Sequence, residues 1–150
     1  MKRKRFLAIT IALSTLVVVL AFPLAGCTGE VGFTTASLSK ATMCKSVDSE
    51  SREPVEPTNV FTPETTEIFC SVSLSNAPSD TKISSEWIYV KGEFEDVSDY
   101  LIDEISITTD GTRYVSFSEP KPENGWPTGD YKVLLYLDGN EKTSVTFKVQ

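Results

Sequence analysis

The sequence contains no histidine, which removes the commonest general base and the commonest metal ligand from a chain of 150 residues. It also lacks a glycine-rich phosphate loop, a nucleotide fingerprint and the paired-cysteine spacing of zinc sites. A serine nucleophile with a lysine base stays open in principle at Ser84 or Ser116, although no flanking motif supports either one. We therefore predict a protein that is not an enzyme and that holds no cofactor or metal.

Basic residues are few, 14 against 21 acidic ones. Four of them, Lys2, Arg3, Lys4 and Arg5, stand at the very start, so the chain beyond residue 26 has 10 basic and 21 acidic residues and a net charge of −11. Such a charge repels nucleic acid and anionic lipid head groups. We predict that nucleic acid is not a partner.

The N-terminal segment has the layout of a secretory signal peptide. After the basic start, no residue from Phe6 to Ala21 carries a charge. A retained membrane helix is the alternative, since about 20 apolar residues suffice to span a bilayer core. The residues that end the apolar stretch favour the signal peptide.

Those residues, Leu24-Ala25-Gly26-Cys27, resemble the lipobox of bacterial lipoproteins, in which a lipid-modified cysteine follows a branched apolar residue and two small ones. The resemblance covers the first 27 residues. It implies cleavage before Cys27, a diacylglyceryl group on its sulfur, often a further acyl chain such as palmitate, and attachment to the extracytoplasmic face of a cell membrane. Two or three acyl chains, at about 0.8 kcal/mol per buried CH₂, anchor a protein firmly. The alternative is an unmodified cysteine near the end of a membrane helix.

Three segments follow from this interpretation. We expect a lipoprotein signal peptide over 1–26, a lipidated cysteine with a short tether over 27–36, and one folded domain over 37–150. Residues 28–35 of the tether reach at most about 25 Å at about 3.3 Å per residue.

Beyond the tether, the hydrophobic pattern is that of short strands, most clearly over 67–75, where apolar and serine side chains alternate. Tight turns are predicted at Asp110-Gly111 and at Asp138-Gly139-Asn140, each closing a hairpin. A loop is expected over 76–80, and a loop with one helical turn over 93–103. We predict about seven strands, at 38–47, 67–75, 83–91, 102–109, 113–118, 131–137 and 143–149.

Seven short strands in a chain of this size resemble the immunoglobulin-like and fibronectin-like modules of bacterial lipoproteins, which implies an all-β, two-layer antiparallel sandwich. The likeness is strongest near the C-terminus, where Trp126-Pro127-Thr128-Gly129-Asp130-Tyr131-Lys132-Val133 runs into an alternating strand. Within it, Tyr131 corresponds to the tyrosine corner, with a packed ring and a hydroxyl bonded to nearby backbone. Cys70 and Trp87 correspond to the first core cysteine and the core tryptophan, but Val133 replaces the second cysteine, so the usual bridge between sheets is absent.

Cys44 and Cys70 need another account, because an exported domain meets an oxidising environment in many bacteria. If Cys27 is lipidated, these two are the remaining thiols, and the simplest pairing is a disulfide between them. Such a bridge would contribute roughly 3.5 kcal/mol on the chain-entropy model. The alternative is a pair of buried free thiols that behave as small apolar residues.

Two further features bear on binding. Six carboxylates fall close together, and such oxygen-rich segments can hold calcium, although we expect these to be solvated; they are Glu93, Glu95, Asp96, Asp99, Asp103 and Glu104. Trp126 lies in a loop, either exposed for stacking on a sugar or, as we expect, closing one end of the sandwich.

The leading hypothesis is a membrane-anchored, extracytoplasmic and non-catalytic interaction module whose partner is an envelope or extracellular protein. A carbohydrate- or calcium-binding surface module is the alternative, and it needs either an exposed Trp126 or an acidic segment gathered around an ion. An enzyme would need a buried polar constellation that the sequence does not display.

Overall fold

The computed structural model describes residues 35–94 and 96–150. The predicted signal peptide, the lipid attachment at Cys27 and all but the end of the tether lie outside these residues and stay predictions. The described part contains seven strands: β1 (Ser37–Val47), β2 (Pro54–Pro57), β3 (Val60–Phe61), β4 (Glu67–Gly92), β5 (Tyr100–Pro120), β6 (Gly129–Leu137) and β7 (Asn140–Val149). No helix occurs in it, and hence none that is long and apolar enough to cross a membrane.

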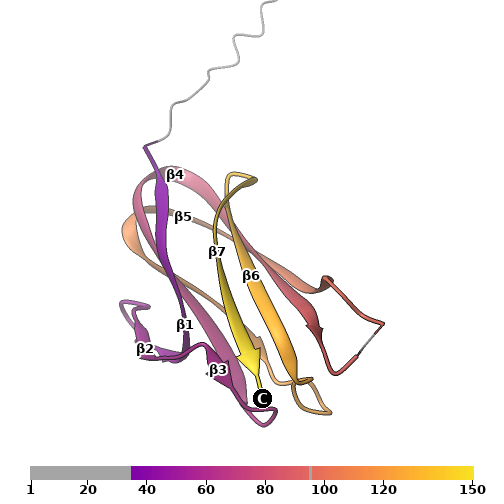
Figure 1. Ribbon diagram of the computed structural model, residues 1–150. Helices are drawn as coiled ribbons and strands as arrows, with labels where there is room; N and C mark the ends of the chain where they lie inside the picture. Colours follow the sequence, from indigo (N-terminus) through magenta and orange to yellow (C-terminus); the bar gives the residue numbers. More distant parts are fainter. Residues whose placement is uncertain (1–34, 95) are drawn as a thin grey trace, which may run out of the picture. The chain divides into compact units, whose positions relative to one another are not determined.

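The strands form one curled sheet whose two halves pack face to face as layers (Figure 1). The first layer consists of β2, β1, residues 67–75 of β4 and residues 113–120 of β5. The second consists of residues 100–109 of β5, residues 81–92 of β4, and β6, β7 and β3. The predicted all-β two-layer sandwich is confirmed. One departure from the antiparallel expectation is the parallel pairing of β3 with β7.

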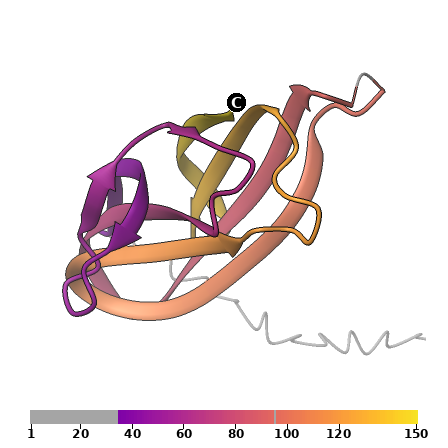
Figure 2. The same ribbon diagram turned by 90° about the horizontal axis from the view of Figure 1, so that it is seen from below.

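Strands β4 and β5 pass from one layer to the other without ending, and Figure 2 shows the long curl of β5. Asn76 and Asp80 adopt left-handed backbone, with φ of 53° and 63°, and the register with β5 shifts there. The loop predicted over 76–80 is thus a bend inside β4. The hairpin predicted at Asp110-Gly111 is wrong, because residues before and after it pair with β4 and not with each other. Gly111, with φ of 75°, bends an edge strand instead of closing a turn.

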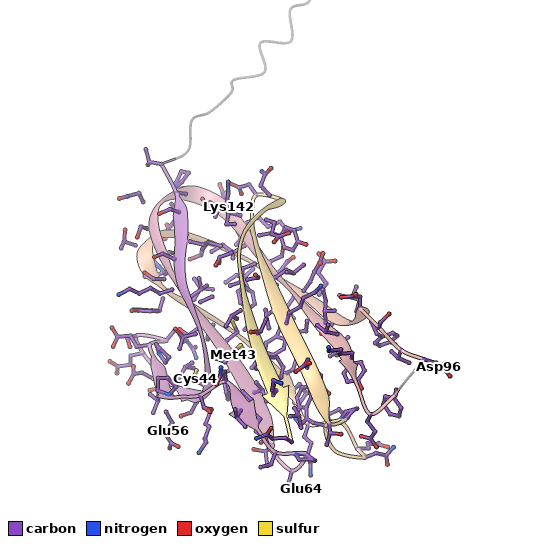
Figure 3. All side chains as sticks on the ribbon, in the orientation of Figure 1. Met43, Cys44, Glu56, Glu64, Asp96 and Lys142 are labelled. Carbon is purple, nitrogen blue, oxygen red and sulfur yellow. The ribbon has the colours of Figure 1, made fainter. Side chains whose placement is uncertain are left out.

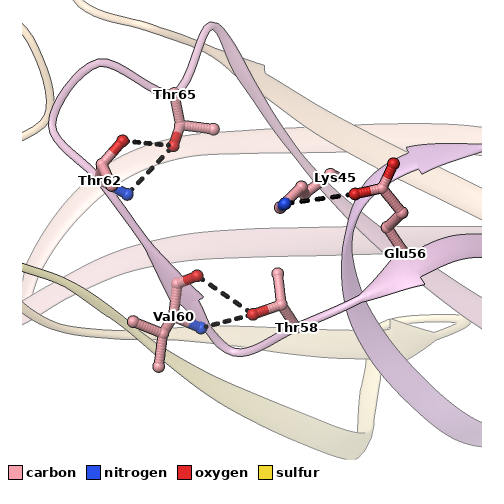
Figure 4. A network of polar contacts seen from close by, with 6 residues as sticks. All are labelled: Lys45, Glu56, Thr58, Val60, Thr62 and Thr65. Atoms are coloured by element: carbon pink, nitrogen blue, oxygen red, sulfur yellow. Dashed lines mark hydrogen bonds and ion pairs between the residues drawn. The ribbon is translucent and has the colours of Figure 1, made fainter.

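The two shortest strands, β2 and β3, were not predicted. They belong to the segment that leaves the first layer, reaches β7 and then returns to begin β4. Threonine side chains stabilise the turns of this segment (Figure 4). Thr58 Oγ1 donates to the Val60 carbonyl at 3.1 Å and accepts from the Val60 N–H at 3.2 Å. Thr65 Oγ1 accepts from the Thr62 N–H at 3.1 Å. These local side-chain bonds fix the turns between strands that are only four and two residues long, too short to show an alternating hydrophobic pattern.

The second predicted hairpin is confirmed. Leu137 of β6 pairs with Asn140 of β7, and the two residues between them, Asp138 and Gly139, have φ of 48° and 78°. Positive φ at both central positions is what a type I′ turn requires, and this turn matches the right-handed twist of the strands.

The core lies between the layers and is centred on aromatic rings. Trp87 is fully buried, and its ring packs edge-on against Phe147 at a centroid distance of 6.0 Å. Phe147 in turn stacks on Tyr131 at 4.8 Å. The Tyr131 hydroxyl donates to the Pro127 carbonyl at 2.6 Å, which confirms the predicted tyrosine corner. Val133, in the place of the missing core cysteine, is also fully buried.

The expected disulfide between Cys44 and Cys70 is not found, and both residues are buried free thiols. The strand register gives the reason. Cys70 lies opposite Met43, whereas Cys44 lies opposite Phe69, so the two thiols are offset by one residue and leave opposite faces of the sheet (Figure 3 labels Met43 and Cys44). Side chains that point apart cannot be bridged. Burial raises the pKa of both thiols, that of Cys70 to about 12.

Candidate functional site

One end of the sandwich carries a pocket of about 270 Å³ lined by aromatic and aliphatic residues. This end, called the pocket end below, consists of the described residues 93, 94 and 96–99 between β4 and β5, and of residues 121–128, which join β5 to β6. The side chains that form most of the pocket are Tyr89, Phe94, Val97, Tyr100, Ile102 and Trp126. Pro122, Pro127 and Tyr131 complete it.

Trp126 forms a fixed wall of the pocket. Its indole N–H donates to the Thr65 carbonyl at 2.9 Å, and its backbone N–H donates to the Pro63 carbonyl at 3.0 Å. Its ring meets Tyr131 edge-on at 6.0 Å, and the side chain is only 3% exposed. The expectation that Trp126 closes one end of the sandwich is therefore confirmed, and its ring is not free to stack on a sugar.

Tyr89 joins the two loops of the pocket end. Its hydroxyl accepts the Phe94 N–H at 3.2 Å and donates to the Thr128 carbonyl at 3.4 Å. The strands approach closely beside it, since a Cβ on Gly92 would collide with the Thr128 carbonyl and the Gly129 Cα. Glycine at position 92 thus lets the backbone close under the tyrosine ring.

The mouth of the pocket exposes large apolar side chains. Two of its lining residues, Phe94 and Tyr100, are 50% and 61% exposed. Leu101, which is 48% exposed, follows Tyr100 on β5 and lies opposite Ile88, so its side chain is on the outer face beside the pocket. These are three of the five large hydrophobic residues that are exposed in the described part of the chain, and all three lie within eight positions of one another. Single exposed apolar residues are ordinary, but a group of them beside an apolar pocket marks a binding surface.

The predicted acidic cluster does not gather around an ion. Glu93 accepts the Thr128 N–H at 3.1 Å, and Asp99 pairs with Lys132 at 2.9 Å. Glu95 lies outside the described residues. Among residues that are described, no three histidine, cysteine, aspartate or glutamate side chains lie close enough together to hold a metal. Of the described members, Glu93, Asp96 and Asp99 belong to the segment between β4 and β5 and form an acidic rim at the pocket end.

A buried carboxyl beside this rim was missed. Glu119 is only 8% exposed, and its Oε1 is buried without a hydrogen-bond partner. Burial raises the pKa of Glu119 to about 7, and the charge of Asp103 and a hydrogen bond with it act in the same direction. The sequence signal was the alternation of Val115, Phe117 and Glu119, which places the glutamate on the interior side of β5. A carboxyl at an interior strand position is costly unless it has a partner or a role.

Two serines had been open as nucleophiles. Ser84 lies on β4 between Tyr136 of β6 and Ser106 of β5, and Ser116 lies on β5 opposite Ser71. Neither hydroxyl bonds to a lysine in the part of the chain that is described.

The pocket end lies opposite the end where the described chain begins. Thr35 donates its hydroxyl to the Asn76 carbonyl at 3.5 Å, beside the bend of β4. The turn at Asp138 and Gly139 is at this same end, since the Lys82 N–H donates to the Asp138 carboxylate at 2.9 Å. We call it the turn end. Figure 3 shows Lys142 near the turn end and Glu64 and Asp96 far from it.

No protein-family model matches the sequence, and no curated protein matches it. Solved structures resemble the fold at low identity. An immunoglobulin-like protein from Pseudomonas aeruginosa is 10% identical with a TM-score of 0.50, and the match covers 77% of this chain and 96% of that one. This likeness over nearly the whole of a separate protein shows an immunoglobulin-like fold.

Parts of two larger enzymes also match. One is the alkylpurine DNA glycosylase AlkC of Pseudomonas fluorescens, at 12% identity, a TM-score of 0.46 and 77% coverage of this chain. The other is a β-glucosidase involved in saponin metabolism from intestinal bacteria, at 12% identity, a TM-score of 0.47 and 79% coverage. The chain spans 30% of the first and 16% of the second.

Proposed function

We propose that this protein is a lipid-anchored, non-catalytic interaction module on the extracytoplasmic face of a bacterial membrane, and that it binds a partner protein with its pocket end. The observation that carries the proposal is the apolar pocket with Phe94 and Tyr100 exposed at its mouth. Apolar concave sites edged by aromatic residues are typical of interfaces that form and release.

The placement of the two ends supports this orientation. Thr35 is at the turn end and follows Cys27 by eight positions, so a lipid on Cys27 would hold the turn end toward the membrane. The length of the second half of β4, residues 81–92, separates that end from the pocket. At about 3.3 Å per residue this half-strand spans roughly 40 Å, which presents the pocket to partners beyond the lipid surface.

The anchor is tested by the mass of the mature protein from native cells. We expect a chain that begins at Cys27 and carries acyl groups, whereas Cys27→Ala accumulates unprocessed. A wild-type chain that retains residues 1–26 with an unmodified sulfur would contradict the anchoring.

The binding surface is tested by photo-crosslinking in those cells. A photoreactive benzoylphenylalanine at position 101, at the pocket end, should give one discrete protein adduct, and the same group at position 142 on β7 should not. Position 142 is a matched control because Lys142 is equally exposed on a strand. Equal labelling from both positions, or none from position 101, would contradict a pocket-end interface.

A further inference from the structure

Asp103 and Glu119 come from different layers of the sandwich, and both lie on the interior side of β5. Asp103 lies opposite Trp87, and Glu119 lies opposite Ile68. Both partners are fully buried core residues, so both carboxyl groups leave the interior side of β5, one from each layer. Ile102, which lines the pocket, directly precedes Asp103. The pair therefore stands at the side of the pocket.

This pair has an unused acceptor. One oxygen of Glu119 is buried and has no partner, and Asp103 forms no ion pair with a lysine or arginine of the described chain. Two lysines at this end of the sandwich are committed elsewhere, Lys121 to Glu64 at 2.8 Å and Lys132 to Asp99 at 2.9 Å. A buried acceptor without a donor favours a ligand that brings one, and a cationic donor suits two carboxyl groups best.

The backbone beside the pair is also free. Strand β5 bonds to β4 along its length, and no strand within residues 35–94 and 96–150 pairs with its other edge. An edge strand with unpaired N–H and C=O groups accepts an extended peptide. Tyr100 and Asp103 both face the interior side of this edge, opposite Tyr89 and Trp87, which are two positions apart on β4.

We propose that the start of β5 binds an extended segment of the partner protein in which an aromatic or branched apolar residue is followed two positions on by lysine or arginine. The inference rests on the proposed function and specifies its partner. The apolar side chain enters the pocket beside Tyr100 and Ile102. The basic side chain, about 6.6 Å further along an extended strand, reaches Asp103 and Glu119. The acidic rim, in which Asp96 is also free of ion pairs among the described residues, attracts the same charge.

The test uses the full chain in phosphatidylcholine nanodiscs and blocked five-residue peptides. The first peptide is threonine-phenylalanine-threonine-lysine-threonine, the second has norleucine for lysine, and the third has serine for phenylalanine. We expect the lysine peptide to bind about tenfold more tightly than the norleucine peptide in a fluorescence-anisotropy titration. One charge-assisted hydrogen bond is enough to produce a difference in affinity of this size. The serine peptide should not bind measurably.

Variants assign the preference to the pair. Asp103→Asn and Glu119→Gln should each bring the lysine peptide down to the affinity of the norleucine peptide, which itself stays unchanged. Glu104→Gln is the matched control, because Glu104 is on the same strand but lies opposite Glu86, on the outer face. This variant should keep the tenfold preference.

The outcomes separate this inference from the proposed function. Equal affinity for the lysine and norleucine peptides, or an equal effect of Glu104→Gln, would overturn the peptide specificity while leaving the pocket as a binding site. No binding of any peptide, combined with a dimer of the chain through β5, would overturn the inference in favour of a second copy on this edge. A failure of crosslinking at position 101 would overturn the proposed function itself.

Discussion

The two ends of this sandwich are closed in different ways. At the turn end, Asn76, Asp80 and Asp138 adopt left-handed backbone, and polar bonds such as that from Lys82 N–H to Asp138 fix the chain. At the pocket end, aromatic rings fill the space between layers, and apolar side chains are left at the surface. Within residues 35–94 and 96–150, the turns at 76–80 and 138–140 expose no large hydrophobic side chain, so this end of the sandwich is closed by local turns alone. The apolar mouth of the pocket end is therefore an addition to what the fold needs.

The largest expected effect is at the wall of the pocket. Trp126→Ala removes a buried indole and its bond to Thr65, and should lower the free energy of unfolding by about 3–5 kcal/mol. Urea unfolding of the full chain, followed by the fluorescence of Trp87, measures this loss. A cost below about 1 kcal/mol would mean that the ring does not close this end.

The next effect depends on pH. The pKa of Glu119 is about 7 in the folded protein, above its ordinary value of 4.5, so the folded state holds a proton that the unfolded state releases. The stability contributed by this proton is complete below pH 4.5 and is lost as the pH rises through 7. Glu119→Gln cannot ionise and should be more stable than the wild type at pH 8, on the order of 2 kcal/mol, with a small difference at pH 4.5.

Unfolding curves of the two proteins at a series of pH values test this prediction, and the difference between them is the quantity to follow because other groups titrate in both. A difference that does not change with pH would contradict a raised pKa at Glu119.

A smaller effect is expected at the turn end. Gly139 has φ of 78°, and a Cβ there would meet no atom within 4 Å. Gly139→Ala should therefore cost about 1 kcal/mol through backbone conformation alone. Thermal unfolding measures it. A loss as large as that of Trp126→Ala would mean that the two ends contribute equally to the free energy of unfolding.

The smallest effect on stability is expected beside the pocket, on the outer face of β5. Leu101→Ser replaces a half-exposed side chain and should change the free energy of unfolding by less than about 0.5 kcal/mol. The same change should weaken binding of both the lysine and the norleucine peptide, because the exposed leucine lies on the outer face of the edge that the peptide pairs with and contacts its outward-facing threonine side chains. Val55 on β2 is similarly exposed, at 41%, so Val55→Ser is the control that should leave binding intact. Substantial destabilisation by Leu101→Ser would mean that this exposed leucine serves the fold and not binding.

Local patterns predicted most of the fold. Alternation located the strand residues of β4, β5, β6 and β7, and the pair Asp138-Gly139 located a real hairpin because its turn depends on those two residues alone. The same reasoning failed at Asp110-Gly111. A glycine with positive φ serves a turn or a bend equally well, and only the position of β4 alongside both halves of β5 decides between them.

The candidate site could be predicted only in part. Trp126 and Tyr131 stood out as aromatic residues near a turn, and their roles at the end of the core were expected. The pocket depends on two loops that are distant in sequence, and Glu119 meets Asp103 only because β5 curls through both layers. The disulfide expectation failed for a related reason, since a single residue of register places Cys44 and Cys70 on opposite faces.

Hydrogen–deuterium exchange on the full chain tests the contrast between the two ends most directly. Amides of residues 100–103 should exchange more slowly in native membranes, where a partner is present, than in nanodiscs that hold the purified protein. Amides at 76–80 and 138–140 should exchange alike in both. Equal exchange of residues 100–103 in the two preparations, or protection confined to the turn end, would contradict a binding surface at the pocket end.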